Sequence, residues 1–290
     1  MSQRKQPTPP FPKQQQAKPG SEKKLRPRPN YQAPAYKPAD KLTGRVALIT
    51  GGDSGIGRAV AVLFAREGAD IALNYLDVEQ PDADETRQAI EQQGRRALLI
   101  PGDLTDAAFC RELVERTVEH FGHLDIVVNN AAFQQHQPSL EELDDAQLEH
   151  TFQTNILAMF RVTRAALPHL PRGAAIINTG SITGLQGSAQ LLDYSSTKGA
   201  IHAFTKSLAQ SLVDRGIRVN CVAPGPVWTP LNASDKPADQ VATFGQKVPM
   251  GRPAQPEEIA PAFVFFATQA DSSYITGEVL TALGGETTAA

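Results

Sequence analysis

The sequence predicts a single doubly wound α/β domain, in which a seven-stranded parallel sheet carries helices on both faces. Three observations support this prediction. From Lys41 onward, short aliphatic or β-branched runs alternate with longer amphipathic stretches, which is typical of repeated βα units. Several of the short runs are almost continuously apolar, as expected where both faces of a strand are buried. A glycine-rich turn joins the first short run to the first long stretch.

The predicted strands are short runs rich in Val, Ile, Leu or Ala, separated by turn signals or helical stretches. In chain order they are 45–50 (RVALIT), 70–75 (DIALNY), 97–100 (ALLI), 125–129 (DIVVN), 174–178 (AAIIN), 218–222 (RVNCV) and 278–283 (EVLTAL).

The longer stretches between these strands are predicted as helices, because they are amphipathic and long enough to cross back over the sheet. They lie near 56–67, 83–93, 106–121, 145–170, 194–215 and 257–268. Pro81, Pro171, Pro224 and Pro256 fall at segment edges, where proline is tolerated. Nothing is left over for a second domain, so residues 41–290 are expected to form one domain.

Residues 1–40 are predicted to be an extended arm. They hold nine of the 22 prolines and six glutamines, with almost no aliphatic side chains to build a core. Two alternatives stay open for this arm. It is disordered, or it lies along a neighbouring subunit with Phe11, Tyr31 and Tyr36 as anchors.

Charge and composition exclude several classes of protein. The arm has nine basic side chains against Glu22 and Asp40, which leaves residues 41–290 with 19 basic and 29 acidic ones. Such an acidic body argues against a nucleic-acid partner. Cys110 and Cys221 are far apart, so neither a disulfide framework nor a zinc site is indicated. We expect a cytoplasmic protein without a membrane anchor, because the chain has no long apolar run and no secretory signal.

The turn after the first predicted strand reads Thr50-Gly51-Gly52-Asp53-Ser54-Gly55-Ile56-Gly57. Glycines permit positive φ and remove the Cβ atoms that would block a pyrophosphate, and the free N–H groups of the following helix attract negative charge. This turn therefore favours a dinucleotide in a Rossmann-type fold. A plain glycine-rich turn remains the alternative, because the spacing departs from the commoner dinucleotide fingerprint.

Tyr194 and Lys198 lie four residues apart in a predicted helix, so their side chains share one face. A free tyrosine has a pKa near 10 and is a poor base at neutral pH. A nearby ammonium group stabilises the phenolate, although lowering its pKa to about 7 needs on the order of 4 kcal/mol. The pair is therefore a candidate acid/base centre, and an exposed helix with an unrelated tyrosine and lysine is the alternative.

Two further polar residues accompany this pair. Ser181 follows the fifth predicted strand, at the sheet edge where ligands of open α/β folds bind. Its hydroxyl would hold a substrate oxygen, or it would serve only in a turn. Asn155 lies inside an apolar helical stretch, where it would bond to the backbone or hold a water molecule for the lysine.

With these residues in place, the chain resembles the short-chain dehydrogenase/reductase family, in its TGxxxGxG subgroup. The resemblance runs from about Lys41 to Gly285. Its basic, proline-rich arm further resembles a bacterial branch of general-stress oxidoreductases with glucose-dehydrogenase-like relatives. The positions that carry the resemblance are the glycine turn, Asp103, Asn129-Asn130-Ala131-Ala132, Asn155, Ser181, Tyr194, Lys198, Pro224-Gly225 and Thr229.

The resemblance implies a role for each of these side chains. Ser181 positions the substrate oxygen, Tyr194 exchanges its proton, Lys198 lowers the tyrosine pKa and binds ribose, and Asn155 holds a relay water. Asp103 contacts adenine, Asn129 touches the cofactor or braces the sheet, and Thr229 contacts the nicotinamide. The implied cofactor-binding set is Gly51, Asp53, Ser54, Gly55, Ile56, Gly57, Asn74, Tyr75, Asp103, Leu104, Asn130, Ala131, Tyr194, Lys198, Pro224, Gly225, Val227 and Thr229.

This sequence departs from the family pattern at two places. Ala132 stands where the family usually has glycine, which adds a methyl group near the cofactor. The run Leu280-Thr281-Ala282-Leu283-Gly284-Gly285 lacks the usual Asp or Asn, which puts a family contact from that strand in doubt.

The cofactor is expected to be NAD or NADP, with NAD favoured. An acid at the end of the second strand usually selects NAD and an arginine NADP. That segment reads Asn74-Tyr75-Leu76-Asp77 here, so neither signal is in its usual place, although Asp77 and Asp53 add negative charge. Arg58 would pair with a phosphate, or it is a solvated side chain.

The expected reaction moves a hydride between the nicotinamide and a CH–OH or C=O carbon of a small alcohol, polyol, sugar or ketone, without a metal. Substrate choice is assigned to residues 226–253, a mobile flap over the site. Trp228, Leu231, Phe244 and Met250 would line an apolar wall or pack the flap down. Gln186, Gln190 and Asp193 would meet hydroxyl groups.

Two other functions stay open. One is reduction of a 3-ketoacyl thioester, which would want a basic patch for an acidic carrier protein. The other is a dinucleotide-binding stress or regulatory protein with weak catalysis. The family resemblance also implies a homo-tetramer, built partly on the long helices around Asn155 and after Tyr194.

Overall fold

A seven-stranded sheet, with every strand parallel to its neighbours, lies at the centre of the computed structural model, which describes residues 6–287. The strand order is β3-β2-β1-β4-β5-β6-β7, which confirms the predicted fold class and number of strands. The strands are β1 (Val46–Thr50), β2 (Asp70–Tyr75), β3 (Ala97–Pro101), β4 (Ile126–Asn129), β5 (Ala175–Thr179), β6 (Arg218–Pro224) and β7 (Val279–Ala282).

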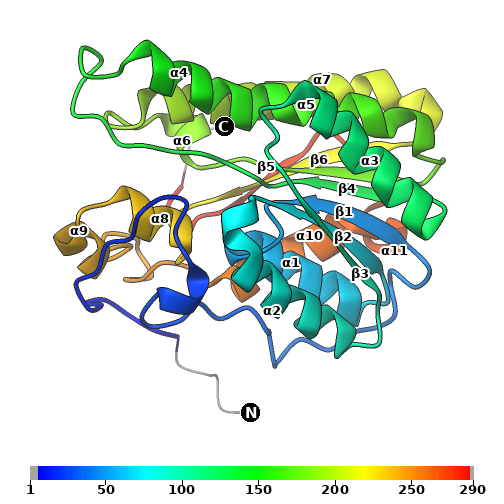
Figure 1. Cartoon of the computed structure of the whole chain (residues 1–290), viewed down its shortest axis with the longest axis horizontal. Coiled ribbons are helices and arrows are strands. Elements are labelled where there is room, and N and C mark those ends of the chain that lie inside the picture. Colours follow the sequence, from blue (N-terminus) through cyan, green and yellow to red (C-terminus); the bar gives the residue numbers. More distant parts are fainter. Residues whose placement is uncertain (1–5, 288–290) are drawn as a thin grey trace.

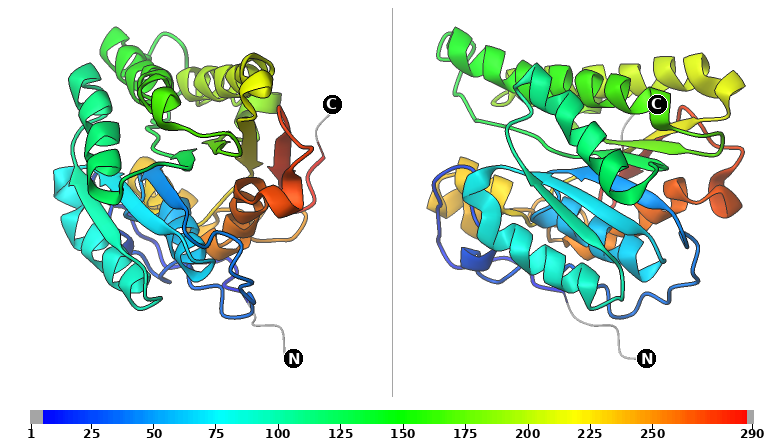
Figure 2. Two further views of the ribbon diagram at one scale, coloured as in Figure 1. Left: turned by 90° about the vertical axis from the view of Figure 1, so that its right-hand side faces the viewer. Right: turned by 45° about the vertical axis from the view of Figure 1, so that its right-hand side comes forward.

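Helices cover both faces of the sheet, as Figure 1 and the end-on view in Figure 2 show. One layer holds α1 (Gly55–Arg66), α2 (Gln80–Glu91) and α10 (Pro256–Ala267). The other holds α3 (Ala107–Phe121), α4 (Asp145–Phe152), α5 (Ala158–Ala166) and α7 (Leu192–Leu212). The shorter elements are α6 (Thr183–Gln186), α8 (Pro230–Asp235), α9 (Ala238–Ala242), α11 (Gln269–Ser272), and the single turns Glu22–Lys24, Asp77–Glu79, Leu167–His169 and Val213–Arg215.

The apolar runs become buried strands because their alternate side chains enter two separate cores. In β1, Ala47 and Ile49 pack with α1 and α10, whereas Val46 and Leu48 pack with α3 and α5. All five residues of β1 are buried. A strand that is buried on both faces favours apolar side chains in both directions, which explains why this part of the sequence is almost continuously apolar.

One predicted helix differs from the structure. The stretch 145–170 is not a single helix, because a π-helical turn over Gln153–Leu157 separates α4 from α5 and a 3₁₀ turn follows. A π turn inserts one extra residue without breaking the apolar stripe, so hydrophobic spacing does not reveal it. Asn155 lies within this turn.

The described part of the N-terminal arm packs against its own chain. Phe11 is buried beside Trp228, with ring centroids 4.2 Å apart, and its N–H donates to the carbonyl of Ala242. Tyr31 and Tyr36 pack at the edge of the core under α1 and α10. Figure 2 shows the arm passing beside α8 and α9 and then along the side of the molecule that holds α1 and α2. The three aromatic residues therefore anchor the arm within one chain.

Candidate active site

A cleft of about 590 Å³ opens at the carboxyl ends of the neighbouring strands β1 and β4. The chain leads from β1 to one half of the sheet and from β4 to the other half. This is the switch point at which open α/β sheets bind ligands. Most of the sequence-predicted site residues line it. They are Gly51, Asp53, Ser54, Gly55, Ile56, Asn74, Tyr75, Asp103, Leu104, Asn130, Ala131, Ser181, Tyr194, Lys198, Pro224, Gly225, Val227 and Thr229.

The glycine loop takes a backbone path that side chains would obstruct. Gly51 and Gly55 have φ of 60° and 53°, in the left-handed region that favours glycine. A Cβ on Gly57 would stand 1.9 Å from the carbonyl oxygen of Gly51. The missing side chain of Gly57 thus allows α1 to start directly under the loop. Gly57 itself is not part of the cleft lining.

Asn130 ties the loop to the neighbouring strands. Its side-chain amide donates to the carbonyls of Thr50 and Gly51 at 3.2 and 2.9 Å, and its Oδ1 accepts from the Thr179 hydroxyl. The Thr50 hydroxyl accepts from the N–H groups of Asn130 and Ala131. These bonds hold the ends of β1, β4 and β5 together at the floor of the cleft.

The end of β2 presents a different carboxyl from the one predicted. Asn74 donates to the carbonyl of Gly102, while Asp77 is exposed and lies outside the cleft. Glu79, two residues further on, lines the cleft and accepts from the Leu76 N–H at 2.9 Å. Burial raises the pKa of Glu79 to about 8, and burial also raises the pKa of Asp53 to about 6.

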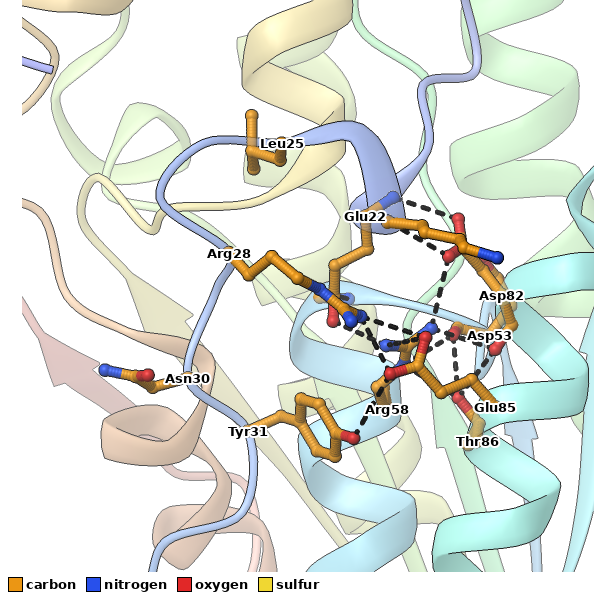
Figure 3. A network of polar contacts seen from close by, with 12 residues as sticks. Glu22, Leu25, Arg28, Asn30, Tyr31, Asp53, Arg58, Asp82, Glu85 and Thr86 are labelled. Carbon is orange, nitrogen blue, oxygen red and sulfur yellow. Dashed lines mark hydrogen bonds and ion pairs between the residues drawn. The ribbon is translucent and has the colours of Figure 1, made fainter. Parts of the chain in front are cut away.

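Arg58 is neither solvated nor free to meet a phosphate. It is fully buried, and its guanidinium pairs with Glu22 at 2.7 Å and with Asp82 at 3.4 Å. Figure 3 shows these partners converging from the arm and from α2. The sequence alone does not reveal this pairing, because Glu22 lies 36 residues away in a segment without secondary-structure signals.

Tyr194 and Lys198 face the cleft from the first turns of α7. The ammonium nitrogen of Lys198 lies 5.3 Å from the centroid of the Tyr194 ring and donates to the carbonyl of Thr179 at 2.7 Å. Both side chains are buried, as is that of Ser181 after β5. The Ser181 hydroxyl accepts from the N–H and the hydroxyl of Thr183, within reach of the phenol.

The electrostatics of the pair differ from the simple expectation. Burial raises the pKa of Tyr194 to about 12, against the lowering effect of a hydrogen bond with Ser181. Burial lowers the pKa of Lys198 to about 8. The residues of this chain therefore hold a neutral phenol beside an ammonium group at neutral pH, and they do not by themselves lower the phenol pKa. Desolvation of Tyr194 outweighs the hydrogen bond with Ser181, and the negative charge of Asp235 raises the phenol pKa further.

Asn155 lies beneath the cleft. Its Oδ1 accepts from the N–H of Phe133 at 2.7 Å, and its amide donates to the Phe133 carbonyl and the Thr197 hydroxyl. It also lines a separate cavity of about 10 Å³, room for roughly one water molecule. Within the described residues, two buried atoms that line this cavity, Asn129 Oδ1 and Thr154 Oγ1, have no hydrogen-bond partner.

Of the other predicted residues, Asn129 holds the strands of the sheet together, whereas Asp103 and Thr229 line the cleft. The Asn129 amide donates to Thr163 and Asn178, which braces the sheet. Asp103 is exposed at the cleft and accepts from the N–H of Thr105. The Thr229 hydroxyl accepts from Asn232. A Cβ on Gly55 would stand 3.0 Å from the Thr229 methyl group, so this threonine lies directly over the glycine loop.

The segment 226–253 forms α8 and α9 over the site. Leu231 and Phe244 line the cleft, whereas Trp228 packs under the arm and Met250 is exposed. The predicted contacts of Gln186, Gln190 and Asp193 with a substrate are not supported. The two glutamines lie outside the lining, and buried Asp193 accepts from Thr151 and Gln147.

A polar wall that sequence reasoning missed faces the cleft. The Asp235 carboxylate accepts from Nδ1 of His136 at 2.5 Å and from Nε2 of Gln134 at 2.9 Å. The ammonium of Lys236 lies 2.9 Å from Nε2 of His136. Lys18 of the arm reaches the same wall and donates to the Gln134 carbonyl at 2.6 Å. The only signal in the sequence is the polar content of the segment around Asp235.

The described residues show neither a metal site nor a membrane-spanning helix. Among residues 6–287, no group of three or more His, Cys, Asp or Glu side chains is arranged to bind a metal ion. Within the same residues, no helix has the length and apolar character needed to cross a membrane.

A Rossmann-type sheet, a glycine loop at its switch point and a tyrosine–lysine pair facing the same cleft define a nicotinamide-dependent oxidoreductase. The comparisons with known proteins agree with this class. A family model described as "Enoyl-(Acyl carrier protein) reductase" matches residues 51–287. The chain belongs to the short-chain dehydrogenase/reductase family, and the predicted resemblance is confirmed.

Related proteins match over almost the whole chain. "Uncharacterized oxidoreductase YhdF" of Bacillus subtilis is 54% identical over 274 residues, 94% of each chain. "General stress protein 39" of the same organism is 52% identical over 271 residues, 93% of this chain and 94% of that one. "Glucose and ribitol dehydrogenase" of Daucus carota is 48% identical over 279 residues, 94% of this chain and 96% of that one.

Solved structures share the fold. A short-chain dehydrogenase from Burkholderia cenocepacia in complex with NADP is 34% identical with a TM-score of 0.79, and the match covers 84% of this chain and 98% of that one. "NADH-dependent reductase A1-R'" complexed with NAD is 32% identical with a TM-score of 0.74, covering 85% and 98%. The protein is thus an NAD(P)-dependent oxidoreductase of this family, and relatives differ in the cofactor they carry.

Proposed function

We propose that the chain transfers a hydride between a nicotinamide and the CH–OH or C=O carbon of a small hydroxylated or carbonyl substrate, with Tyr194 as the acid/base group. The bound cofactor would accept or supply the hydride. In the oxidising direction, the deprotonated Tyr194 phenolate takes the hydroxyl proton as the C–H hydride leaves. In the reducing direction, the protonated phenol gives its proton to the developing alkoxide and becomes the phenolate. The observation that carries the proposal is the buried Tyr194–Lys198 pair facing the cleft, with Ser181 alongside.

Each of these three side chains has a separate task in this proposal. The Ser181 hydroxyl orients the substrate oxygen by donating a hydrogen bond to it. Lys198, held by the Thr179 carbonyl, keeps positive charge beside the phenol. Since burial holds the pKa of Tyr194 above its usual value, the positive charge of an oxidised nicotinamide would supply the stabilisation that the phenolate needs.

The dinucleotide would lie along the cleft from Glu79 to Tyr194. The N–H of Gly55 donates to Glu22, and the other N–H groups at the start of α1 suit the pyrophosphate. Gly51 and Gly55 line this end of the cleft without a Cβ atom that would obstruct it. Asp103 and Thr229 remain proposed contacts for adenine and nicotinamide. Ala132 adds its methyl group to the same lining.

We favour NAD over NADP for this chain. Asp53 and Glu79 line the cleft after β1 and β2, where their oxygens would accept hydrogen bonds from ribose hydroxyls. The guanidinium of Arg58, which would otherwise pair with a 2′-phosphate, is buried against Glu22 and Asp82. In a Glu79→Gln variant, kcat/KM for NADP(H) should rise severalfold relative to that for NAD(H). An unchanged ratio would contradict this assignment.

The polar wall favours a substrate rich in hydroxyl groups, such as a sugar or polyol. Asp235 raises the pKa of Tyr194 through its charge, which places the wall within electrostatic reach of the reacting group. The ammonium groups of Lys18 and Lys236 each retain donors beyond those used within the wall, because an ammonium has three N–H groups. Leu231 and Phe244 would cover the carbon chain.

Asn155 is proposed to take part in a proton relay through the small cavity that it lines together with Thr179, whose carbonyl accepts from Lys198. The unpaired oxygens of Asn129 and Thr154 are suited to hold one water molecule there. The Asn155 side chain itself is occupied by Phe133 and Thr197, so its contribution would be to hold the π turn that shapes the cavity.

The decisive experiment is a panel of sugars, polyols, aldehydes and ketones, each assayed in both directions with NAD(H) and NADP(H). Turnover of several hydroxylated substrates is the expected result. Activity only on a carrier-bound 3-ketoacyl thioester would instead identify a thioester reductase. Tight cofactor binding with no turnover across the panel would favour a regulatory protein and contradict the proposed reaction.

A further inference from the structure

The N-terminal arm reaches the cofactor end of the cleft through one buried carboxyl group. Glu22 lies in the 3₁₀ turn Glu22–Lys24 of the arm and is completely buried. Its Oε2 accepts from the N–H of Gly55 at 2.6 Å, and its Oε1 accepts from Nη1 of Arg58 at 2.7 Å. Figure 3 shows the carboxyl group pointing from the arm toward the base of the glycine loop.

The other end of the loop is held from outside by the same network. Nε of Arg58 and the hydroxyl of Thr86 both donate to the carbonyl of Asp53, at 2.9 and 2.7 Å. Arg58 also donates to the carbonyl of Asp82. Asp53 and Gly55 are therefore fixed at both sides of Ser54 by groups that lie behind the cleft.

The arm is in turn fixed where it delivers Glu22. The N–H groups of Glu22 and Lys23 donate to the Asp82 carboxylate at 2.9 and 3.2 Å. Leu25 is completely buried in the small core around Trp228. Tyr31 and Arg28 flank the network and contact Glu85. The position of the carboxyl group thus depends on contacts along the arm and on α2.

We propose that Glu22 is a positioning residue for the cofactor, which holds the glycine loop in its binding conformation without touching the dinucleotide. This inference rests on the proposal that the loop binds the pyrophosphate. Because Glu22 is not part of the cleft lining, it acts through the backbone of Gly55 and through Arg58. The arm is then a component of the cofactor site, although it precedes the part of the chain that matches the family model.

The test compares Glu22→Gln with Glu85→Gln in the full-length chain. A glutamine has the same shape, but its amide would oppose one of the two donors that the carboxylate satisfies. Glu85→Gln also removes a negative charge beside Arg58, at 3.6 Å, without any contact to the loop. The dissociation constants of NAD(H) and NADP(H) are measured by calorimetric titration, together with KM, kcat and the thermal midpoint.

For Glu22→Gln we expect the dissociation constant and KM of both cofactors to rise about tenfold, the size of one charged hydrogen bond. We expect kcat at saturating cofactor to stay within about twofold, because the reacting residues are untouched. Glu85→Gln should leave all these constants within about twofold. Thr86→Val, which removes a bond to Asp53 and keeps the side-chain shape, should shift them in the same direction as Glu22→Gln. The Thr86→Val variant keeps the proposal testable if Glu22→Gln does not fold.

Three results would overturn the proposal. They are unchanged cofactor affinity in folded Glu22→Gln and Thr86→Val, an equal loss in Glu85→Gln, or a selective gain for NADP(H). The last result would mean that Glu22 acts by repelling a phosphate and not by holding the loop. If the wild-type chain binds no nicotinamide dinucleotide, the proposed function itself fails, which is a separate outcome.

Discussion

At the scale of single residues, the Tyr194–Lys198 pair shows how strongly burial changes the pKa of a side chain. The pKa of Tyr194 is raised to about 12 and that of Lys198 is lowered to about 8, in both cases chiefly by burial. Both shifts disfavour the charged form of the group, so the site holds a proton on the phenol until further positive charge arrives. Under the proposed mechanism, this arrangement would couple the acidity of Tyr194 to the binding of an oxidised cofactor.

Replacing Tyr194 by phenylalanine should reduce turnover by about 10³-fold, within the range expected for loss of a positioned acid/base group. Cofactor affinity should stay within about twofold, because the ring and its packing are retained. Steady-state kinetics and calorimetric titration of the cofactor measure the two effects. Lys198→Met is the companion variant and should impair both turnover and affinity. A phenylalanine variant with normal turnover would exclude Tyr194 as the acid/base group.

The carboxyl group of Glu79 predicts a dependence of stability on pH. Its pKa is raised to about 8 by burial, so the folded chain keeps a proton that the unfolded chain has lost above pH 4.5. The free energy of unfolding should therefore fall as the pH rises from about 5 to 8, as far as Glu79 contributes. A Glu79→Gln variant lacks this loss, and its thermal midpoint should exceed that of the wild type by several degrees at pH 9 but not at pH 4. Parallel midpoint curves across this range would refute the assignment.

At the scale of elements, the arm is attached by apolar anchors such as Phe11 and by polar contacts such as the Glu22–Arg58 pair. The 3₁₀ turn at Glu22–Lys24 is too short to hold it in place by itself. Phe11→Ala should destabilise the chain by about 3 kcal/mol, because it removes a buried ring that packs on Trp228. Urea denaturation followed by the fluorescence of Trp228, the single tryptophan, measures this loss. Lys13→Ala removes an exposed ion pair with Asp239 and serves as the control, with an expected change below about 0.5 kcal/mol.

The π turn holds Asn155, the residue of the proposed proton relay. Asn155 holds it against the loop after β4 through two bonds to Phe133. Asn155→Ala should lower kcat at least tenfold, with KM for the cofactor changed less than about threefold, since the cavity would lose its shape while the glycine loop stays intact. Comparable losses in kcat and in cofactor affinity would point to general disruption and contradict a relay at this position.

At the scale of the whole molecule, an apolar surface at the junction of the π turn and α5 suggests assembly. Leu157 and Phe160 are 38% and 48% exposed, and Phe160 stacks on Phe204 of α7. We therefore keep the homo-tetramer as a prediction, with the α4, α5 and α7 layer as an interface. Light scattering at micromolar concentration should give the mass of four chains, and Phe160→Asp should reduce it to that of a dimer or a single chain. A wild-type monomer would contradict the prediction.

The amino-acid sequence by itself determined the parallel sheet, its seven strands, the glycine loop and the tyrosine–lysine pair. These features depend on periodicity and on short spacings, such as the four residues from Tyr194 to Lys198. A local stretch of sequence is therefore enough to predict each of them. Only the tertiary structure decided that Glu22 meets Arg58, that Glu79 and not Asp77 lines the cleft, and that Lys18 and Asp235 share one wall. These residues are up to 217 positions apart in the sequence and meet only when the chain folds. Local sequence patterns extend over a few residues, so they cannot predict such contacts.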